Sequence, residues 1–99
     1  MAPIGEVPAD VLDAITSEAA EHAGVEPSKV TIRTAEAVTW SDGSLGCPKP
    51  GMMYTQALVP GYRVVLEAGR ATIEYHASER GSIRFCDDPQ PPVDSPVDR

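Results

Sequence analysis

The sequence YRVVLEAGRATIEYHASERGSIRFC (residues 62–86) decides the fold of this chain. It holds three runs with β-branched and aromatic residues, separated by turn sequences at Gly69–Arg70 and at residues 78–81. Such runs are typical of strands, and short sequential hairpins leave no room for the crossovers of a parallel sheet. Residues 62–67, 71–76 and 82–86 are therefore predicted to form an antiparallel meander.

Two further strands are predicted before the meander. Residues 30–34 alternate apolar and polar side chains, and this pattern continues raggedly to Trp40. Residues 53–59 also suit a strand, and Pro60–Gly61 would then be the turn that leads into the meander.

An amphipathic helix is predicted at the N-terminal end. Asp10 can cap its first turn, and Gly24 followed by Pro27 is a stop signal. Apolar residues recur between them at three- and four-residue spacing, namely Val11, Leu12, Ile15, Ala19 and Ala23. This gives one helix of about 14 residues with an acidic outer face.

These elements predict an α+β fold in which one N-terminal helix packs on a four- to five-stranded, mainly antiparallel sheet. We expect the helix to cover an apolar set that comprises Val64, Leu66, Ile73, Tyr75, Ile83 and Phe85. Residues 1–8 are predicted to be a flexible lead, residues 9–86 a single domain, and residues 87–99 a disordered, acidic, Pro-rich tail.

Composition and charge limit the classes of partner. The net charge is −7, and acidic residues dominate in residues 1–29 and 87–99. Without a basic stripe, nucleic acid is not an expected partner, and no apolar run is long enough for a membrane span. The chain begins without a signal sequence, which predicts a cytoplasmic protein, or an exported one if a leader was removed. A monomer is expected.

The loop between the first strand and the meander is the unusual part of the sequence. Residues 40–51 contain three Gly, two Pro, the single Trp and one of the two Cys. No regular helix or strand tolerates that composition, so a long rigid Gly/Pro/Cys loop is predicted.

The loop also carries a motif, W-x-D-G-S-L-G-C-P-x-P-G-x-x-Y-x-Q, at residues 40–56, followed by P-G-Y at residues 60–62. This pattern resembles a family of small uncharacterised bacterial domains. The resemblance covers residues 30–86 and implies neither an activity, a cofactor nor a catalytic residue. Relatives with this pattern often look exported or lipid-anchored.

Cys47 in the loop and Cys86 at the end of the last strand are predicted to form a disulfide. In the chain-entropy model, closing about 40 residues would stabilise the fold by roughly 4 kcal/mol. Two separate thiols are the alternative in a reducing compartment, and a redox enzyme is a weaker one because the pair is not a C-x-x-C.

Catalytic and metal sites have little support in the sequence. Ser44, His76 and Asp42 could be written as a triad, but no nucleophile elbow is present, and a Cys47–His76 pair would be abolished by the disulfide. A zinc site from Cys47, Cys86, His76 and His22 lacks the short paired spacings of structural zinc sites. No catalytic residue, metal or cofactor is therefore predicted.

A non-enzymatic binding module that presents the rigid loop at residues 40–54 is the favoured interpretation. Large apolar anchors and a restricted backbone both favour recognition of a protein or a small ligand. A protease inhibitor that uses the same loop, and a small enzyme or redox protein that uses Cys47 and His76, are the alternatives. The predicted contact residues are Trp40, Asp42, Lys49, Met52, Met53, Tyr54, Tyr62 and His76.

Overall fold

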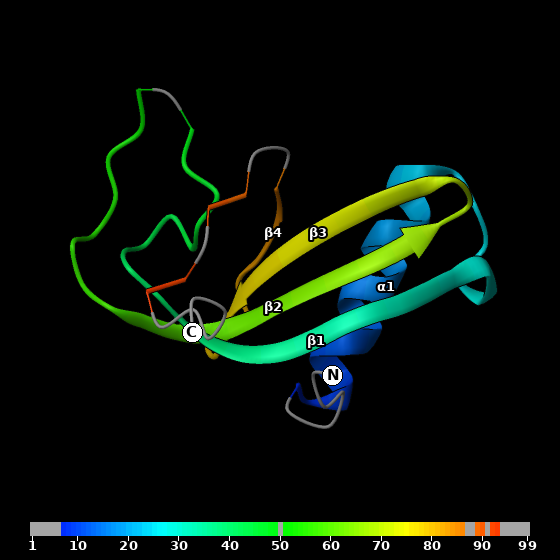
Figure 1. Cartoon of the computed structure of the whole chain (residues 1–99), viewed down its shortest axis with the longest axis horizontal. Helices are drawn as coiled ribbons and strands as arrows, with labels where there is room; N and C mark the ends of the chain where they lie inside the picture. Colours follow the sequence, from blue (N-terminus) through cyan, green and yellow to red (C-terminus); the bar gives the residue numbers. More distant parts are fainter. Residues whose placement is uncertain (1–6, 50, 87–88, 91, 94–99) are drawn as a thin grey trace, which may run out of the picture.

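A computed structural model describes residues 7–49, 51–86, 89–90 and 92–93. Its elements are α1 (Ala9–Ala23), the 3-10 helix η2 (Pro27–Lys29), and four strands, β1 (Val30–Trp40), β2 (Val59–Ala68), β3 (Ala71–Ser78) and β4 (Ile83–Cys86). The strands form one antiparallel sheet in the order β1-β2-β3-β4, and α1 runs behind it (Figure 1). This architecture confirms the predicted α+β class. None of the helices in the described ranges is long and apolar enough to cross a membrane.

Helix α1 ends as predicted but begins differently. Gly24 has φ 72°, and the N–H of Val25 donates to the carbonyl of Ala20 at 3.0 Å, which closes the last turn. At the other end Pro8 is the N-cap residue and no side chain caps the helix, so the prediction for Asp10 is wrong. Asp10 instead lies in the first turn, where its carboxylate faces the positive end of the helix dipole.

The main core lies between α1 and one face of the sheet. Ile15 and Ala19 of the helix are fully buried there against Val64, Leu66, Ile73 and Tyr75, as predicted. Ile83 is partly buried at the margin of this core. Phe85 was expected to be covered but is 37% exposed. Its ring contacts His22 of the helix, with centroids 4.2 Å apart and a tilt of 33° between the rings.

Residues 53–58 do not form the predicted strand. They belong to the connection between β1 and β2, where alternation alone cannot make a strand without a neighbour to pair with.

Pro60 and Gly61 lie inside β2 rather than in a turn. Pro60 pairs with Thr39 and Gly61 with Val38, so β2 continues straight past this dipeptide. A Cβ at Gly61 would collide with the carbonyl of Ala77 on β3, which explains why a glycine is needed at this crossing.

The other face of the sheet is covered only at one end. Residues that alternate with the core positions point to this face, among them Glu36, Arg63, Glu74 and His76. The loop after β1 folds over the end near Trp40 and makes a second small core from Val38, Trp40 and Leu45, against which Val59 packs. The sheet is therefore sandwiched between α1 and the loop at one end only.

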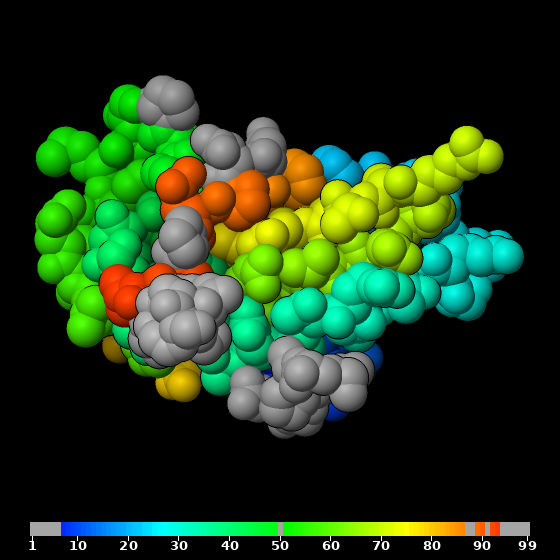
Figure 2. Space-filling view, in the orientation of Figure 1, coloured from blue at the N-terminus to red at the C-terminus, as the bar shows by residue number. Residues whose placement is uncertain are grey.

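The described part of the C-terminal segment lies across this loop, as the orange and red atoms in Figure 2 show. The N–H of Gln90 donates to the carbonyl of Gly46 at 2.9 Å, and the N–H of Val93 donates to that of Thr39 at 3.0 Å. Gln90 and Val93 thus contact the fold, and the predicted domain bounds of residues 9–86 remain a prediction. Residues 1–6 of the predicted lead (residues 1–8) lie outside the described residues, and so do residues 87–88, 91 and 94–99 of the predicted tail (residues 87–99).

Candidate functional site

The inner part of the loop, residues 41–47, is shaped by its own hydrogen bonds. The Asp42 carboxylate accepts from the N–H of Ser44 at 2.9 Å and from its hydroxyl at 2.6 Å. Leu45 and Gly46 follow with φ of 58° and 75°, which reverse the chain toward the sheet. A left-handed leucine costs about 1–2 kcal/mol. Burying its side chain against Trp40 offsets this cost.

Trp40 and His76 form the centre of the site. Their rings stack with centroids 4.1 Å apart and an interplanar angle of 20°, and both side chains are fully buried. The indole N–H of Trp40 donates to the carbonyl of Ala77 at 3.1 Å. The stacked pair is therefore fixed in position by packing and by a hydrogen bond to β3.

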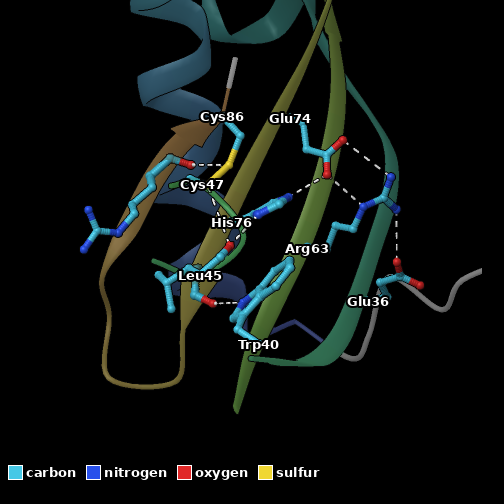
Figure 3. Close-up of polar contacts among 10 residues, drawn as sticks. Glu36, Trp40, Leu45, Cys47, Arg63, Glu74, His76 and Cys86 are labelled. Atoms are coloured by element: carbon cyan, nitrogen blue, oxygen red, sulfur yellow. Dashed lines mark hydrogen bonds and ion pairs between the residues drawn. A yellow bond between two sulfur atoms is a disulfide. The ribbon is translucent and has the colours of Figure 1, made fainter. Parts of the chain in front are cut away.

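Both ring nitrogens of His76 have a partner that accepts hydrogen bonds (Figure 3). Nδ1 lies 2.6 Å from the carbonyl oxygen of Leu45, and Nε2 lies 2.6 Å from Oε2 of Glu74. A carbonyl can only accept, and so can an ionised carboxylate. The ring of His76 is therefore held in place by an oxygen partner at each nitrogen.

Glu74 belongs to a chain of alternating charges on the open face of the sheet. Arg63 donates from Nε to Glu74 at 2.8 Å and from NH1 to Glu36 at 3.0 Å. Burial alone would raise the pKa of Glu74, but hydrogen bonds from His76 and Arg63 outweigh burial and lower that pKa below its usual value. The network thus favours the ionised form of Glu74.

The pKa of Arg63 is raised by the same network. Burial would lower it, but the hydrogen bonds and charges of Glu74 and Glu36 outweigh that effect. Arg63 therefore joins two carboxylates, Glu36 on β1 and Glu74 on β3, across the open face of the sheet.

Cys47 and Cys86 are joined in a disulfide, with Cα atoms 5.3 Å apart. The register of the sheet explains their meeting, since Cys86 on β4 pairs with Glu74 on β3 and so points to the face that the loop covers. The disulfide ties the loop to the edge of the sheet at a sequence separation of 39. The two sulfurs and a ring nitrogen of His76 all lie within 4.8 Å of one another, and all three residues are buried.

The outer part of the loop, which we call the outer loop (residues 48–49 and 51–58), faces solvent. Met53 is 94% exposed, Leu58 65% and Met52 59%. Two contacts hold this segment: the N–H of Gly43 donates to the carbonyl of Thr55 at 2.9 Å, and the N–H of Lys49 donates to the Tyr54 hydroxyl at 3.1 Å. The outer loop therefore presents three exposed apolar side chains and is attached to residues 41–47 by the hydrogen bond from Gly43 to Thr55.

The structure divides the predicted contact residues into three groups. Trp40 and His76 are fully buried inside the site, so they support the loop and cannot touch a partner directly. Tyr62 lies in the main core beneath α1, on the other side of the sheet. The rest lie in the loop and are exposed or half-buried, namely Asp42, Lys49, Met52, Met53 and Tyr54.

The candidate triad is not assembled. Ser44 is buried and its hydroxyl donates to Asp42, while both nitrogens of His76 are engaged by Leu45 and Glu74. The disulfide occupies the thiol of Cys47. The described arrangement therefore provides no free nucleophile next to a base.

Sequence reasoning missed the residues that orient His76, namely Glu36, Arg63 and Glu74. A signal for one of them was present, because Glu74 and His76 are two residues apart on a strand and so share a face. Glu36 and Arg63 could be found only from the strand register, which pairs Glu36 with Arg63 and Arg63 with His76.

Comparisons with known proteins place the chain without assigning it an activity. No significant match was found among curated proteins, and none among solved structures. One family model, described as Domain of unknown function (DUF8738), matches residues 12–86. These residues include α1 from Leu12 onward, the loop and the four described strands, so the match includes the whole candidate site. The chain belongs to this family of domains of unknown function.

Proposed function

We propose that this protein is a small recognition module whose contact surface is the outer loop. The observation that carries the proposal is the exposure of Met52, Met53 and Leu58 within one short segment. Exposed Met side chains are common at recognition surfaces, because Met adapts its shape to a partner. The partner class that fits is a protein or peptide with an apolar groove.

The base of the loop supports this proposal. The disulfide, the Trp40–His76 stack and the hydrogen bond from Gly43 to Thr55 hold the chain on which the outer loop is mounted. A segment with restricted freedom loses less conformational entropy when it binds. The packing of residues 41–47 would then raise the affinity of the outer loop for a partner, because less conformational entropy is lost on binding.

Protease inhibition is a second candidate, for one specific reason. Met53 is almost fully exposed, and the chain on either side is tied down through Lys49–Tyr54 and Gly43–Thr55. An inhibitor needs such an exposed side chain on a restrained loop. The enzyme alternative through Cys47 and His76 has less support, since both side chains are buried and already bonded.

A displayed-peptide selection on the oxidised protein tests the proposal. Selected peptides should lose affinity for the Met52→Ser/Met53→Ser double variant by roughly a hundredfold, if each side chain contributes about 1.4 kcal/mol. Val93→Ser is the matched control, since Val93 is also an exposed apolar residue (52%) but lies outside the outer loop. Its affinity should be unchanged.

Chemical-shift mapping with a selected peptide gives the contradicting outcome. Shifts centred on the acidic face of α1, at Glu18 and Glu21, with the outer loop unmoved, would place recognition on the helix. Turnover of generic ester or peptide substrates that disappears in His76→Gln would instead support the enzyme alternative. A protease panel separates inhibition from plain binding.

A further inference from the structure

We propose that the reduced form of this protein binds one zinc ion through Cys47, Cys86 and His76. The two sulfurs and the ring nitrogen lie within 4.8 Å of one another in three buried residues that come from the loop, β4 and β3. Two thiolates and one imidazole are a ligand set that Zn²⁺ prefers. This inference does not rest on the proposed recognition function.

The sequence argued against zinc because the cysteines lack a short paired spacing. The fold supplies the proximity by another route. Cys86 on β4 pairs with Glu74 on β3, and Glu74 is two residues from His76, so all three side chains lie on the same face of the sheet. The inner part of the loop folds over this face and brings Cys47 next to Cys86. Ligands far apart in sequence thus converge without a zinc-finger motif.

We assign Nδ1 as the ligand nitrogen because Nε2 is bonded to Glu74. The carbonyl oxygen of Leu45 lies 2.6 Å from Nδ1 and 3.7 Å from Sγ of Cys47, so this nitrogen and the sulfur share one neighbour. Nε2 points the other way, to Glu74. In Figure 3 the His76 ring accordingly lies between the cysteine pair and the carboxylate.

A second observation points independently to a metal. Zinc-bound histidines almost always donate their other ring N–H to a carboxylate or carbonyl, which fixes the tautomer and strengthens the ligand. Glu74 occupies that position at 2.6 Å from Nε2 and is itself held by Arg63 at 2.8 Å. Glu74 is therefore already in the position of the carboxylate that commonly holds a zinc-binding histidine.

The chemistry balances with a dithiol as the reductant. The dithiol attacks the Cys47–Cys86 bond through a mixed disulfide and leaves as its own disulfide, and the protein gains two S–H groups. Zn²⁺ then binds both sulfurs and Nδ1, and displaces the two thiol protons and any proton on Nδ1. Nε2 stays hydrogen-bonded to Glu74.

After reduction the two sulfurs must move apart from bonding distance before they can bind zinc. Zn–S bonds of about 2.3 Å and Zn–N bonds of about 2.0 Å in a tetrahedron place neighbouring ligand atoms roughly 3.5–3.8 Å apart. That separation is within the present spread of the three ligand atoms. The carbonyl oxygen of Leu45 is the protein group nearest Nδ1 that can complete four-coordination. The same loop would then be fastened to the sheet by a disulfide when oxidised and by zinc when reduced.

Native mass spectrometry of the full chain tests the proposal. The protein reduced with a phosphine and exposed to Zn²⁺ should carry one zinc per chain, whereas the oxidised protein should carry none. Co²⁺ should give the thiolate charge-transfer bands and strong visible bands of a tetrahedral site with the unaltered chain, so the result does not depend on variants that fold poorly.

Variants assign the site. Cys86→Ser should abolish one-to-one binding, and Glu74→Gln should weaken zinc by 10–100-fold, as loss of an outer-shell partner does. His22→Ala is the matched control and should bind as the unaltered chain does. Failure of the reduced chain to bind zinc or cobalt, retention of affinity in Cys86→Ser or Glu74→Gln, or loss in His22→Ala would each overturn the proposal.

Discussion

Replacement of Gly46 by alanine tests the packing of the inner loop most directly. A Cβ at this position would lie 2.8 Å from Cζ3 of Trp40, 2.8 Å from the carbonyl oxygen of Gln90 and 3.0 Å from Nδ1 of His76. Two of these neighbours are a fully buried ring pair that cannot move aside easily. Gly46 also has φ 75°, where a side chain is strained.

Backbone strain and steric overlap both destabilise the alanine variant. The left-handed backbone costs an alanine about 1–2 kcal/mol, and forcing an extra carbon into a packed site costs about 1–3 kcal/mol. Gly46→Ala should therefore reduce the free energy of unfolding by about 2–5 kcal/mol. For a domain of this size, each 1 kcal/mol lowers Tm by roughly 4–8 °C.

Gly51→Ala is the matched control. Gly51 has φ 80°, but an added Cβ would meet nothing within 4 Å, so only the backbone strain applies. Urea unfolding of both oxidised variants should give a difference of about 1–3 kcal/mol between them. Trp40 is the only tryptophan, so its emission reports the same site. Equal losses for the two variants, with unchanged Trp40 emission, would refute the close packing of the inner loop on the Trp40–His76 stack.

Three further predictions concern the groups around this stack. Cys86→Ser should cost about 4 kcal/mol in urea unfolding, from release of a loop with a sequence separation of 39, and a loss no larger than that of an ordinary surface substitution would contradict the disulfide's role. The folded pKa of Glu74 is lowered below 4.5, so its carboxylate stabilises the fold above that pH, and this contribution is lost as the pH falls through the folded value. A pH series of unfolding free energies should show a shallower acid limb in Glu74→Gln, and parallel limbs would count against the network. Trp40→Phe should cost about 1–3 kcal/mol because the carbonyl of Ala77 loses its indole donor, whereas a stability equal to that of the unaltered chain would show that the hydrogen bond contributes nothing.

Local patterns were sufficient to predict much of the fold. The apolar spacing from Val11 to Ala23 predicted α1, and alternation in residues 62–86 predicted the meander and the inward positions of Val64 and Ile73. These signals are local, because a residue's face depends on its own helix or strand. The same reasoning failed at residues 53–58 and at Pro60–Gly61, where pairing with β1 and close approach to β3 decided the structure.

The candidate site was predicted only in part. The unusual loop and the meeting of Cys47 with Cys86 were apparent from composition and position. The burial of Trp40 and His76 was not, because it depends on the inner loop folding back over the open face of the sheet. Neither Arg63 nor Glu36 stood out, since their roles follow from register between strands that are distant in sequence.

The irregular register of β1 has a consequence for how copies of this protein meet. A free edge strand offers unpaired N–H and C=O groups to any other strand, which promotes aggregation. Here β1 changes register between Ile32 and Thr34, and Val93 bonds to Thr39 near its end. The opposite edge, β4, has only four residues. We therefore expect both edges of the sheet to be poor templates for a strand from another chain.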